Sequence, residues 1–188
     1  MNRVFQIARS VLRAGVALLA ALAAGIAGCG PSQPPPEVVS GVDLARYMGL
    51  WYEIARYPVS FQKGCVAVTA EYSLNADGTV KVRNACRKGT LDGPPKSIAG
   101  VARVPDPADN AKLKVRFFLF FEGDYWIIDL GKDYEYAAVG TPRRNMLWIL
   151  SREPRMKDEL YREIVSRLVA KGFDPKRLVR TPQPAKGI

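Results

Sequence analysis

The stretch from Gly49 to Pro58 reads GLWYEIARYP. Side chains of a β-strand alternate between the two faces of a sheet, so this stretch places Trp51, Glu53 and Ala55 on one face. A bulky indole and a carboxylate then point the same way. The stretch therefore predicts a strand whose inner face carries one charged group among apolar ones.

The clearest turn signal follows in the run VAVTAEYSLNADGTVKVRNAC, residues 66–86. A three-residue loop at 76–78, with Gly78 left-handed, makes this run a β-hairpin. Leu74 then faces Val80, Tyr72 faces Val82, and Ala70 faces Asn84. One face of the hairpin is apolar and holds Val68, Ala70, Tyr72, Leu74, Val80 and Val82.

Further β segments are predicted from the sequence at 97–104, 111–121, 125–130, 134–140 and 146–152. Turn-forming residues separate them, and an amphipathic helix follows Pro154 and stops at Gly172. The chain is therefore expected to be all-β, an eight-stranded antiparallel up-and-down β-barrel with one C-terminal α-helix. The apolar stripe of that helix is expected to pack on the outside of the barrel rather than on a membrane.

Composition narrows the possible functions. The chain has 188 residues, a net charge of +10 and no histidine. Without histidine, the chain cannot carry out Ser-His or Cys-His catalysis. It also lacks the commonest zinc ligand and the usual proximal ligand of haem, so we expect no catalytic residues, metal or cofactor. The basic charge suits an anionic surface, but it is scattered and matches no nucleic-acid-binding motif, so no nucleic acid is expected as a partner.

Residues 1–28 are interpreted as a signal peptide. Three arginines precede the apolar run AGVALLAALAAGI, which ends at Ile26. About 13 apolar residues are short for a membrane-spanning helix and are typical of a secretory signal, with an uncleaved anchor as the alternative.

The tetrapeptide Ile26-Ala27-Gly28-Cys29 resembles the bacterial lipobox, which favours cleavage and lipidation. Cys29 would carry diacylglycerol and a further acyl chain such as palmitate, and acyl burial would hold the protein on a membrane. Gly30, where an aspartate would act as a retention signal, resembles the outer-membrane sorting pattern. Residues 29–41 are proline-rich and are expected to form a tether.

The two other cysteines, Cys65 and Cys86, would face an oxidising periplasm, which favours a disulfide bond between them. The hairpin register, however, places Cys65 opposite Gly89. The bond therefore requires a bulge or bend at the end of the strand.

Three ordered motifs together resemble the lipocalins. They are Gly49-x-Trp51, the arm GKDYEYAAVG that ends at Gly140, and Arg152 at the end of the last strand, followed by a helix. The resemblance spans residues 42–183, leaves 184–188 as a tail, and is nearest to bacterial outer-membrane lipocalins and apolipoprotein D. It implies that Trp51 closes the bottom of the barrel under a cation–π contact from Arg152.

The resemblance also implies a ligand cavity, although aromatic and branched residues on a sheet face are often a filled core. Glu53 would either meet the ligand or satisfy buried donors. The candidate ligand-binding residues are Glu53, Val68, Ala70, Tyr72, Val82, Asn84, Leu113, Val115, Phe117, Tyr125, Ile127, Val139, Met146 and Trp148. Aromatic residues of 116–126 that do not face inward are expected at the barrel mouth or on a membrane.

These features predict a non-enzymatic, outer-membrane-anchored, periplasm-facing carrier of a small hydrophobic ligand such as a fatty acid or lysophospholipid. Apolar walls would bury the acyl chain, and rim residues such as Arg116, Arg143 and Arg144 would meet an anionic head group. One alternative is a cysteine-dependent, lipid-modifying enzyme on the same barrel. Another is an envelope interaction protein with a filled barrel.

Overall fold

The computed structural model describes residues 33–118 and 121–185. The chain divides into Met1–Pro34 and a compact unit, Pro35–Ile188, which contains every element named below. Cys29 and the predicted signal peptide lie outside the described residues.

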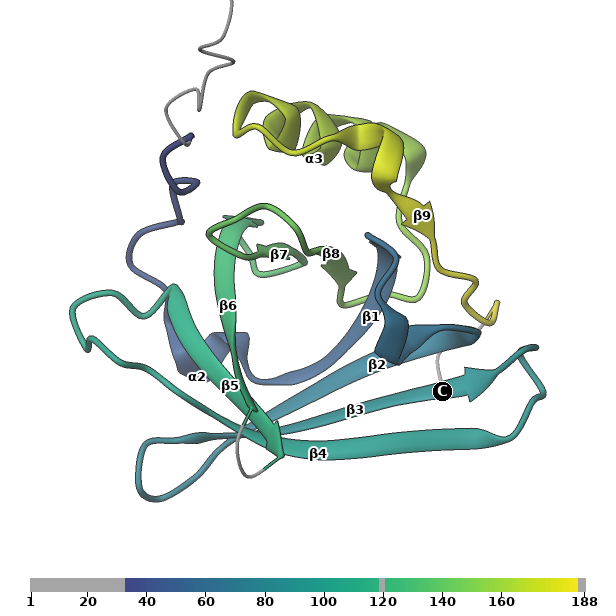
Figure 1. The fold of residues 1–188 in the computed structure, drawn as a ribbon, viewed down its shortest axis with the longest axis horizontal. Helices are drawn as coiled ribbons and strands as arrows, with labels where there is room; N and C mark the ends of the chain where they lie inside the picture. Colours follow the sequence, from purple (N-terminus) through teal and green to yellow (C-terminus); the bar gives the residue numbers. More distant parts are fainter. Residues whose placement is uncertain (1–32, 119–120, 186–188) are drawn as a thin grey trace, which may run out of the picture. The chain divides into compact units, whose positions relative to one another are not determined.

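Eight antiparallel strands form a closed barrel, as predicted (Figure 1). Each strand pairs with the next one along the chain, and β1 pairs with both β2 and β8. Their bounds are Gly49–Arg56 (β1), Cys65–Leu74 (β2), Val80–Lys88 (β3), Pro95–Arg103 (β4), Lys112–Phe118 (β5), Phe121–Leu130 (β6), Tyr136–Gly140 (β7) and Leu147–Ser151 (β8).

The register of the β2–β3 hairpin is confirmed by the structure. Leu74 pairs with Val80, Tyr72 with Val82 and Ala70 with Asn84. Gly78 has φ +81°, a left-handed conformation that glycine adopts without steric cost. The short loop therefore sets which side chains of both strands point into the barrel.

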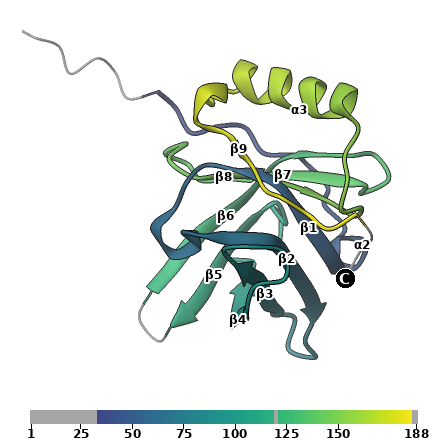
Figure 2. The same cartoon turned by 90° about the vertical axis from the view of Figure 1, so that its right-hand side faces the viewer.

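The C-terminal helix α3, Asp158–Ala170, lies over β7 and β8 on the outside of the barrel (Figure 2). Its buried residues Ile164 and Leu168 pack into an apolar cluster with Tyr57, Ile149 and Phe173. A second apolar cluster fills the barrel around Trp51. The wall of the barrel is therefore covered by apolar contacts on both faces where α3 crosses it.

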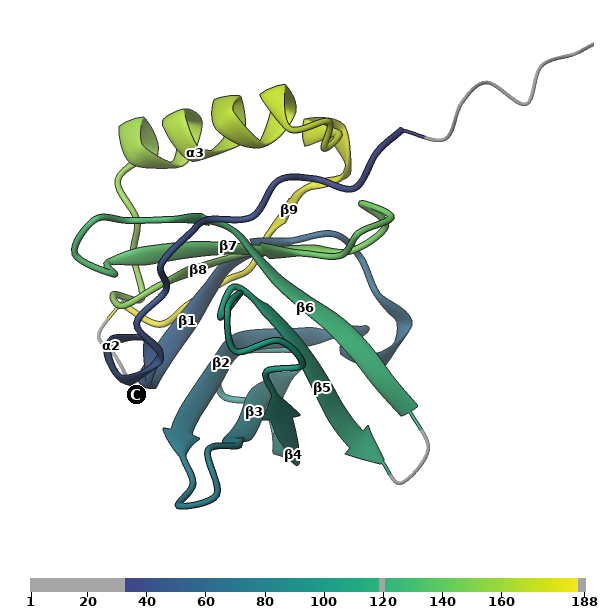
Figure 3. The ribbon, with the colours of Figure 1, turned by 90° about the vertical axis from the view of Figure 1, so that its left-hand side faces the viewer.

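Short elements that the sequence did not predict lie at both ends of the barrel domain. The helix α2, Leu44–Tyr47, starts at Asp43, whose carboxylate accepts from the N–H groups of Ala45 and Arg46. The segment before it runs along β6, where the Val39 N–H donates to the Ile127 carbonyl (Figure 3). Strand β9, Val179–Arg180, adds to the edge of β1, and the 3₁₀ helices η1 (Ser60–Gln62) and η2 (Pro175–Arg177) are single turns.

The prediction that Ala55 points inward is wrong. The pairing of β1 with β8 shifts between Glu53 and Ala55, so the strand has a bulge there. Ala55 belongs to the cluster between the barrel and α3, while Trp51 belongs to the interior cluster. An extra residue in a strand reverses the alternation beyond it.

The predicted disulfide between Cys65 and Cys86 is present, with Cα atoms 5.6 Å apart. Cys65 pairs with Lys88 rather than with Gly89, because the register shifts between Val66 and Thr69. Ala67, in this bulge, has φ +47°. The bulge is the feature that the bond requires. Within the described residues, no helix has the length and apolar character needed to cross a membrane.

Candidate functional site

Trp51 is fully buried at one end of the barrel, and Arg152 covers it. The guanidinium carbon of Arg152 lies 3.7 Å from the centroid of the indole. Its N–H groups donate to the carbonyls of Leu50 at 2.9 Å and Arg46 at 2.8 Å, and the Trp51 indole N–H donates to the Tyr47 carbonyl at 2.9 Å. The cation–π contact therefore joins the end of the last barrel strand to the first strand, and the hydrogen bonds join both residues to α2.

Gly49 is required beside this contact for two reasons. Its φ is +97°, and a Cβ at this position would lie 3.3 Å from Nη1 of Arg152. Any larger residue would be strained and would press on the guanidinium. The glycine two positions before the tryptophan therefore makes room for the cap.

A pocket lies inside the barrel next to the closed end. The free space between its walls is about 10 Å³, room for about one water molecule, so the side chains come close to filling the barrel here. The surface that faces this space is apolar and comes from α2 with its C-cap and from five strands. The lining residues are Tyr47, Met48, Tyr72, Val80, Val82, Ala102, Leu113, Val115 and Tyr125. An apolar lining is typical of small-molecule sites, which usually enclose about 300–1,000 Å³, so a ligand here would require the lining side chains to move apart.

Three of the lining residues are tyrosines whose buried hydroxyls meet one another. The Tyr125 hydroxyl lies 2.8 Å from that of Tyr47 and 2.9 Å from that of Tyr72. Burial raises the pKa of Tyr72 to about 12 and raises the pKa values of Tyr47 and Tyr125 well above the ordinary value. All three phenols are therefore protonated at physiological pH.

Most candidate ligand-binding residues lie in the barrel interior. Seven belong to the buried interior cluster: Ala70, Tyr72, Val82, Leu113, Val115, Ile127 and Val139. Phe117, Tyr125 and Trp148 are half-buried and pack against it. Val68 is buried and Met146 is half-buried, but neither belongs to this cluster.

The sequence did not identify four residues of the pocket as site residues: Tyr47, Met48, Val80 and Ala102. Val80 shares a face with Val82, so strand alternation alone could have identified it. Ala102 pairs with both Val80 and Val115, which depends on register across three strands. Tyr47 and Met48 come from α2 and its C-cap, for which Asp43 is the only sequence signal.

The Glu53 carboxylate is buried within a network of protein groups. It accepts from Arg56 Nη1 at 2.6 Å, from Gln62 Nε2 at 2.8 Å and from the Thr181 hydroxyl. The Arg56 side chain is 12% exposed, so both charges of this pair are largely shielded from water. This arrangement fits the interpretation that Glu53 satisfies buried donors.

Two further polar candidates lie near this network or on the neighbouring wall. The Trp148 indole N–H donates to the Gln62 side-chain carbonyl at 2.9 Å. The Asn84 side-chain oxygen is buried and has no hydrogen-bond partner among the described residues. Asn84 therefore has an unused acceptor on the inner face of β3.

The rim residues differ in their surroundings. Arg116 and Arg143 are exposed, whereas the Arg144 guanidinium donates to the Lys171 carbonyl at 2.7 Å. Among the aromatic residues of 116–126, Phe118 is 64% exposed. Trp126 is half-buried and packs against the apolar cluster between the barrel and α3. Phe120 lies outside the described residues.

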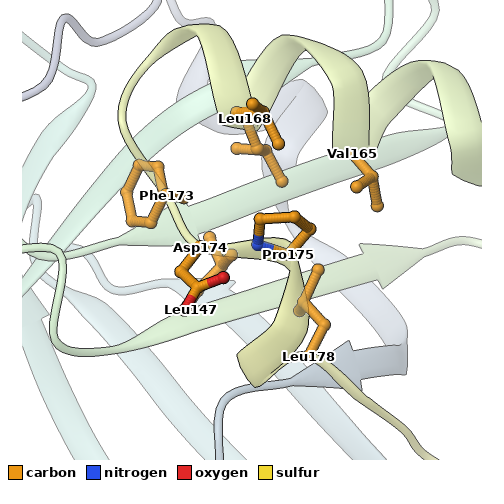
Figure 4. Close-up of a pocket in the computed structure, with 8 residues that line it drawn as sticks. Leu147, Val165, Leu168, Phe173, Asp174, Pro175 and Leu178 are labelled. Atoms are coloured by element: carbon orange, nitrogen blue, oxygen red, sulfur yellow. The ribbon is translucent and has the colours of Figure 1, made fainter.

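A second hollow, too small to hold a water molecule, lies outside the barrel, below α3 (Figure 4). Val165 and Leu168 point from the helix toward Pro175 and Leu178. Most of its lining residues belong to, or pack against, the apolar cluster between the barrel and α3, so the hollow is a gap in the helix packing. Within the described ranges, no group of three acidic, cysteine or histidine side chains could hold a metal ion.

A family model described as a lipocalin-like domain matches residues 42–183. The chain belongs to the lipocalin family. Temperature-induced lipocalin-1 of Arabidopsis thaliana is 43% identical to this lipocalin over 156 residues, which cover 78% of this chain and 82% of that protein. The outer membrane lipoprotein Blc of Escherichia coli (strain K12) is 39% identical over 163 residues, 85% of this chain and 90% of Blc.

Mouse (Mus musculus) apolipoprotein D is 34% identical to this lipocalin over 159 residues, which cover 80% of this chain and 82% of that protein. Insecticyanin from the tobacco hornworm superposes with a TM-score of 0.64 at 19% identity, over 84% of this chain and 88% of insecticyanin. At that identity, the superposition supports the fold and nothing finer.

Replacing Arg152 by alanine is expected to lower the free energy of unfolding by about 2 kcal/mol, because a sheltered cation–π contact and the packing of the arginine stem are both lost. Urea denaturation measures this change. The matched control is Arg180→Ala, which removes a guanidinium 3.4 Å from the centroid of Tyr161 at an exposed position, with an expected loss of less than about 1 kcal/mol. Equal losses would contradict a special role for Arg152.

Replacing Glu53 by alanine is expected to cost about 3–5 kcal/mol, because Arg56 is left as a buried charge without its partner. The double variant Glu53→Ala/Arg56→Met removes both charges and should recover most of this loss in the same denaturation assay. The opposite pattern, an unchanged midpoint with weakened ligand binding, would assign the Glu53 carboxylate to the ligand.

Proposed function

We propose that this lipocalin is a non-enzymatic carrier that binds one small hydrophobic ligand, a fatty acid or lysophospholipid, inside its barrel. The observation that carries the proposal is the apolar pocket beside the Trp51 plug. Its walls would bury an acyl chain at about 25 cal/mol per Å² of apolar surface. Membership of the lipocalin family supports a small hydrophobic ligand, and the choice of a fatty acid or lysophospholipid is part of the proposal.

The polar end of such a ligand would stay at the other end of the barrel. The connections β1–β2, β3–β4, β5–β6 and β7–β8 lie there, opposite α2 and the plug. Arg116 and Arg143 are exposed near these connections and could neutralise a carboxylate or phosphate. This orientation requires no charge to be buried in the pocket.

The proposal includes a lipid anchor on Cys29 that holds the protein at the outer membrane, facing the periplasm. The support is the Ile26-Ala27-Gly28-Cys29 tetrapeptide and the similarity to Blc, whose name describes an outer membrane lipoprotein. Acyl chains on Cys29 would provide stable membrane attachment. The barrel would then meet its ligand close to a lipid surface.

The disulfide bears on the enzymatic alternative. Cys65 and Cys86 are bonded to each other, so neither sulfur is a free thiolate. The described residues therefore give no support to a cysteine nucleophile. The alternative of a filled barrel without ligand is separated from the carrier by the following experiment.

Filling the pocket should abolish binding without unfolding the barrel. The small residue beside the pocket is Ala102, not Ala70, since Ala102 lines the space while Ala70 lies beside Trp51 in the β-ladder. Ala102→Phe is expected to weaken binding of a fluorescent fatty acid or lysophospholipid about tenfold or more, at a cost in stability of about 1–3 kcal/mol. Fluorescence titration and thermal melting measure both effects.

The matched control is Ala99→Phe, on the exposed face of the same strand, which should bind like the unmodified protein. Native mass spectrometry of protein from residue 37 onward would detect lipid that co-purifies. Equal binding by both variants would place the ligand elsewhere. No binding by any of the proteins would indicate a filled barrel.

Anchoring is tested by Cys29→Ser in the full-length protein. We expect an unprocessed precursor that incorporates no labelled palmitate, because the serine hydroxyl does not replace the sulfur that takes the diacylglycerol. Cys86→Ser makes the same substitution in the barrel domain and should still be labelled. Labelled Cys29→Ser protein in the outer-membrane fraction would refute the anchor.

A further inference from the structure

The open end of the barrel exposes apolar side chains on separate connections. Of the aromatic residues whose burial the structure describes, only Phe61, at 61%, and Phe118, at 64%, are exposed. Phe61 lies in the β1–β2 connection, and Phe118 is the last residue of β5. Leu91, in the β3–β4 connection, is also exposed. Exposed aromatic residues that gather at one end of a molecule mark an interaction surface.

Phe61 is held on a firmly bound turn. It lies in η1 next to Gln62, whose side chain is bound at both of its polar atoms. Nε2 of Gln62 donates to Glu53 at 2.8 Å, and Oε1 accepts from the Trp148 indole at 2.9 Å. The Gln62 carbonyl also accepts from Arg56 at 3.4 Å. A turn that is fixed in this way loses little conformational freedom when its exposed side chain is buried by a partner.

Charge differs between the two ends of the barrel. The four open-end connections carry three cations and one acid, which are Lys63, Arg143, Arg144 and Asp92. The three closed-end connections carry one cation and five acids, which are Lys132, Asp77, Asp106, Asp109, Asp133 and Glu135. Lys96 and Arg116 add exposed cations on strands next to the open-end connections. The open end therefore attracts an anionic surface, and the closed end is repelled by one.

The segment before α2 starts at the same end of the barrel (Figure 3). Lys171 Nζ donates to the Glu37 carbonyl at 3.4 Å, and Arg144 of the β7–β8 connection donates to the Lys171 carbonyl at 2.7 Å. Cys29 precedes Glu37 by eight residues, and a chain of that length spans at most about 30 Å. An anchor on Cys29, as proposed above, would therefore keep the open end close to the membrane.

We infer that the open end of the barrel docks directly on a lipid bilayer that contains anionic phospholipids. Phe61 and Phe118 enter the head-group region, while Lys63, Lys96 and the neighbouring arginines meet the lipid phosphates. The apolar side chains lie on separate connections and are accompanied by cations. This pattern suits a lipid interface, whereas the core of a protein–protein interface is depleted of charge. The docking requires neither a ligand in the barrel nor an acyl chain, so it goes beyond the proposed function.

The test is co-sedimentation with vesicles of phosphatidylcholine, with and without about one third phosphatidylglycerol, at low and high salt. The protein used begins at Pro35, which removes the predicted signal peptide and Cys29 from the assay. Residues 35–188 form a compact unit that contains every strand, every helix and both apolar clusters described above, so this part folds on its own. Thermal melting confirms that each variant is folded.

Two pairs of variants separate the ends of the barrel. Phe61→Ser/Phe118→Ser removes the exposed aromatic rings of the open end. Its matched control is Leu74→Ser/Val101→Ser, because these side chains are 51% and 39% exposed but lie at the end of β2 that leads to a closed-end connection and on the barrel wall. Lys63→Gln/Lys96→Gln removes two open-end charges, and Lys132→Gln/Arg155→Gln removes the same net charge from residues in or beyond the closed-end connections.

We expect the unmodified protein to bind the anionic vesicles at low salt, and its partition coefficient to fall about tenfold or more in each open-end variant. High salt should weaken binding, and both control variants should bind like the unmodified protein. Equal losses in the controls, or equal binding without phosphatidylglycerol, would overturn the inference. Absence of vesicle binding by the unmodified protein would also overturn it and would indicate a protein partner for the open end. The assay contains no fatty acid or lysophospholipid, so none of these results decides the carrier function.

Discussion

The contact between Arg152 and Trp51 connects residues that are about as far apart in the chain as the barrel allows. The guanidinium covers the indole and also bonds to carbonyls of α2 and of the start of β1. Tyr47 of α2 also packs against Trp51, with their ring centroids 4.9 Å apart. Because Tyr47 is also part of the pocket wall, the shape of the pocket depends on the plug being in place.

The bulge in β1 divides the strand into two functional halves. Before the bulge, Trp51 contributes to the interior cluster, and Glu53 is neutralised by Arg56. After it, Ala55 packs beneath α3. One inserted residue thus lets a single strand contribute to the barrel interior at one end and to the helix interface at the other.

Local patterns predicted most of the fold and part of the site. Alternation and a glycine loop were sufficient for the β2–β3 hairpin, since its register depends on neighbours within the same segment. The prediction that Ala55 points inward failed because the bulge is determined by the partner strand β8 and leaves no local signal in the sequence. The roles of α2 and Ala102 were also missed, because one turn of helix is too short for periodicity and a pocket depends on several strands together.

The segment that follows α3 completes the wall where β1 and β2 separate. Strand β9 pairs with Ala55 and Arg56, and the Ala67 N–H donates to the Pro182 carbonyl. The Gln183 amide then bridges the carbonyls of Glu53 and Val68. Synthesis proceeds from the N-terminus, so this seam stays open until residues near 183 have been made. The barrel therefore closes late in synthesis, because the first strand is fully paired only after nearly the whole polypeptide has been made.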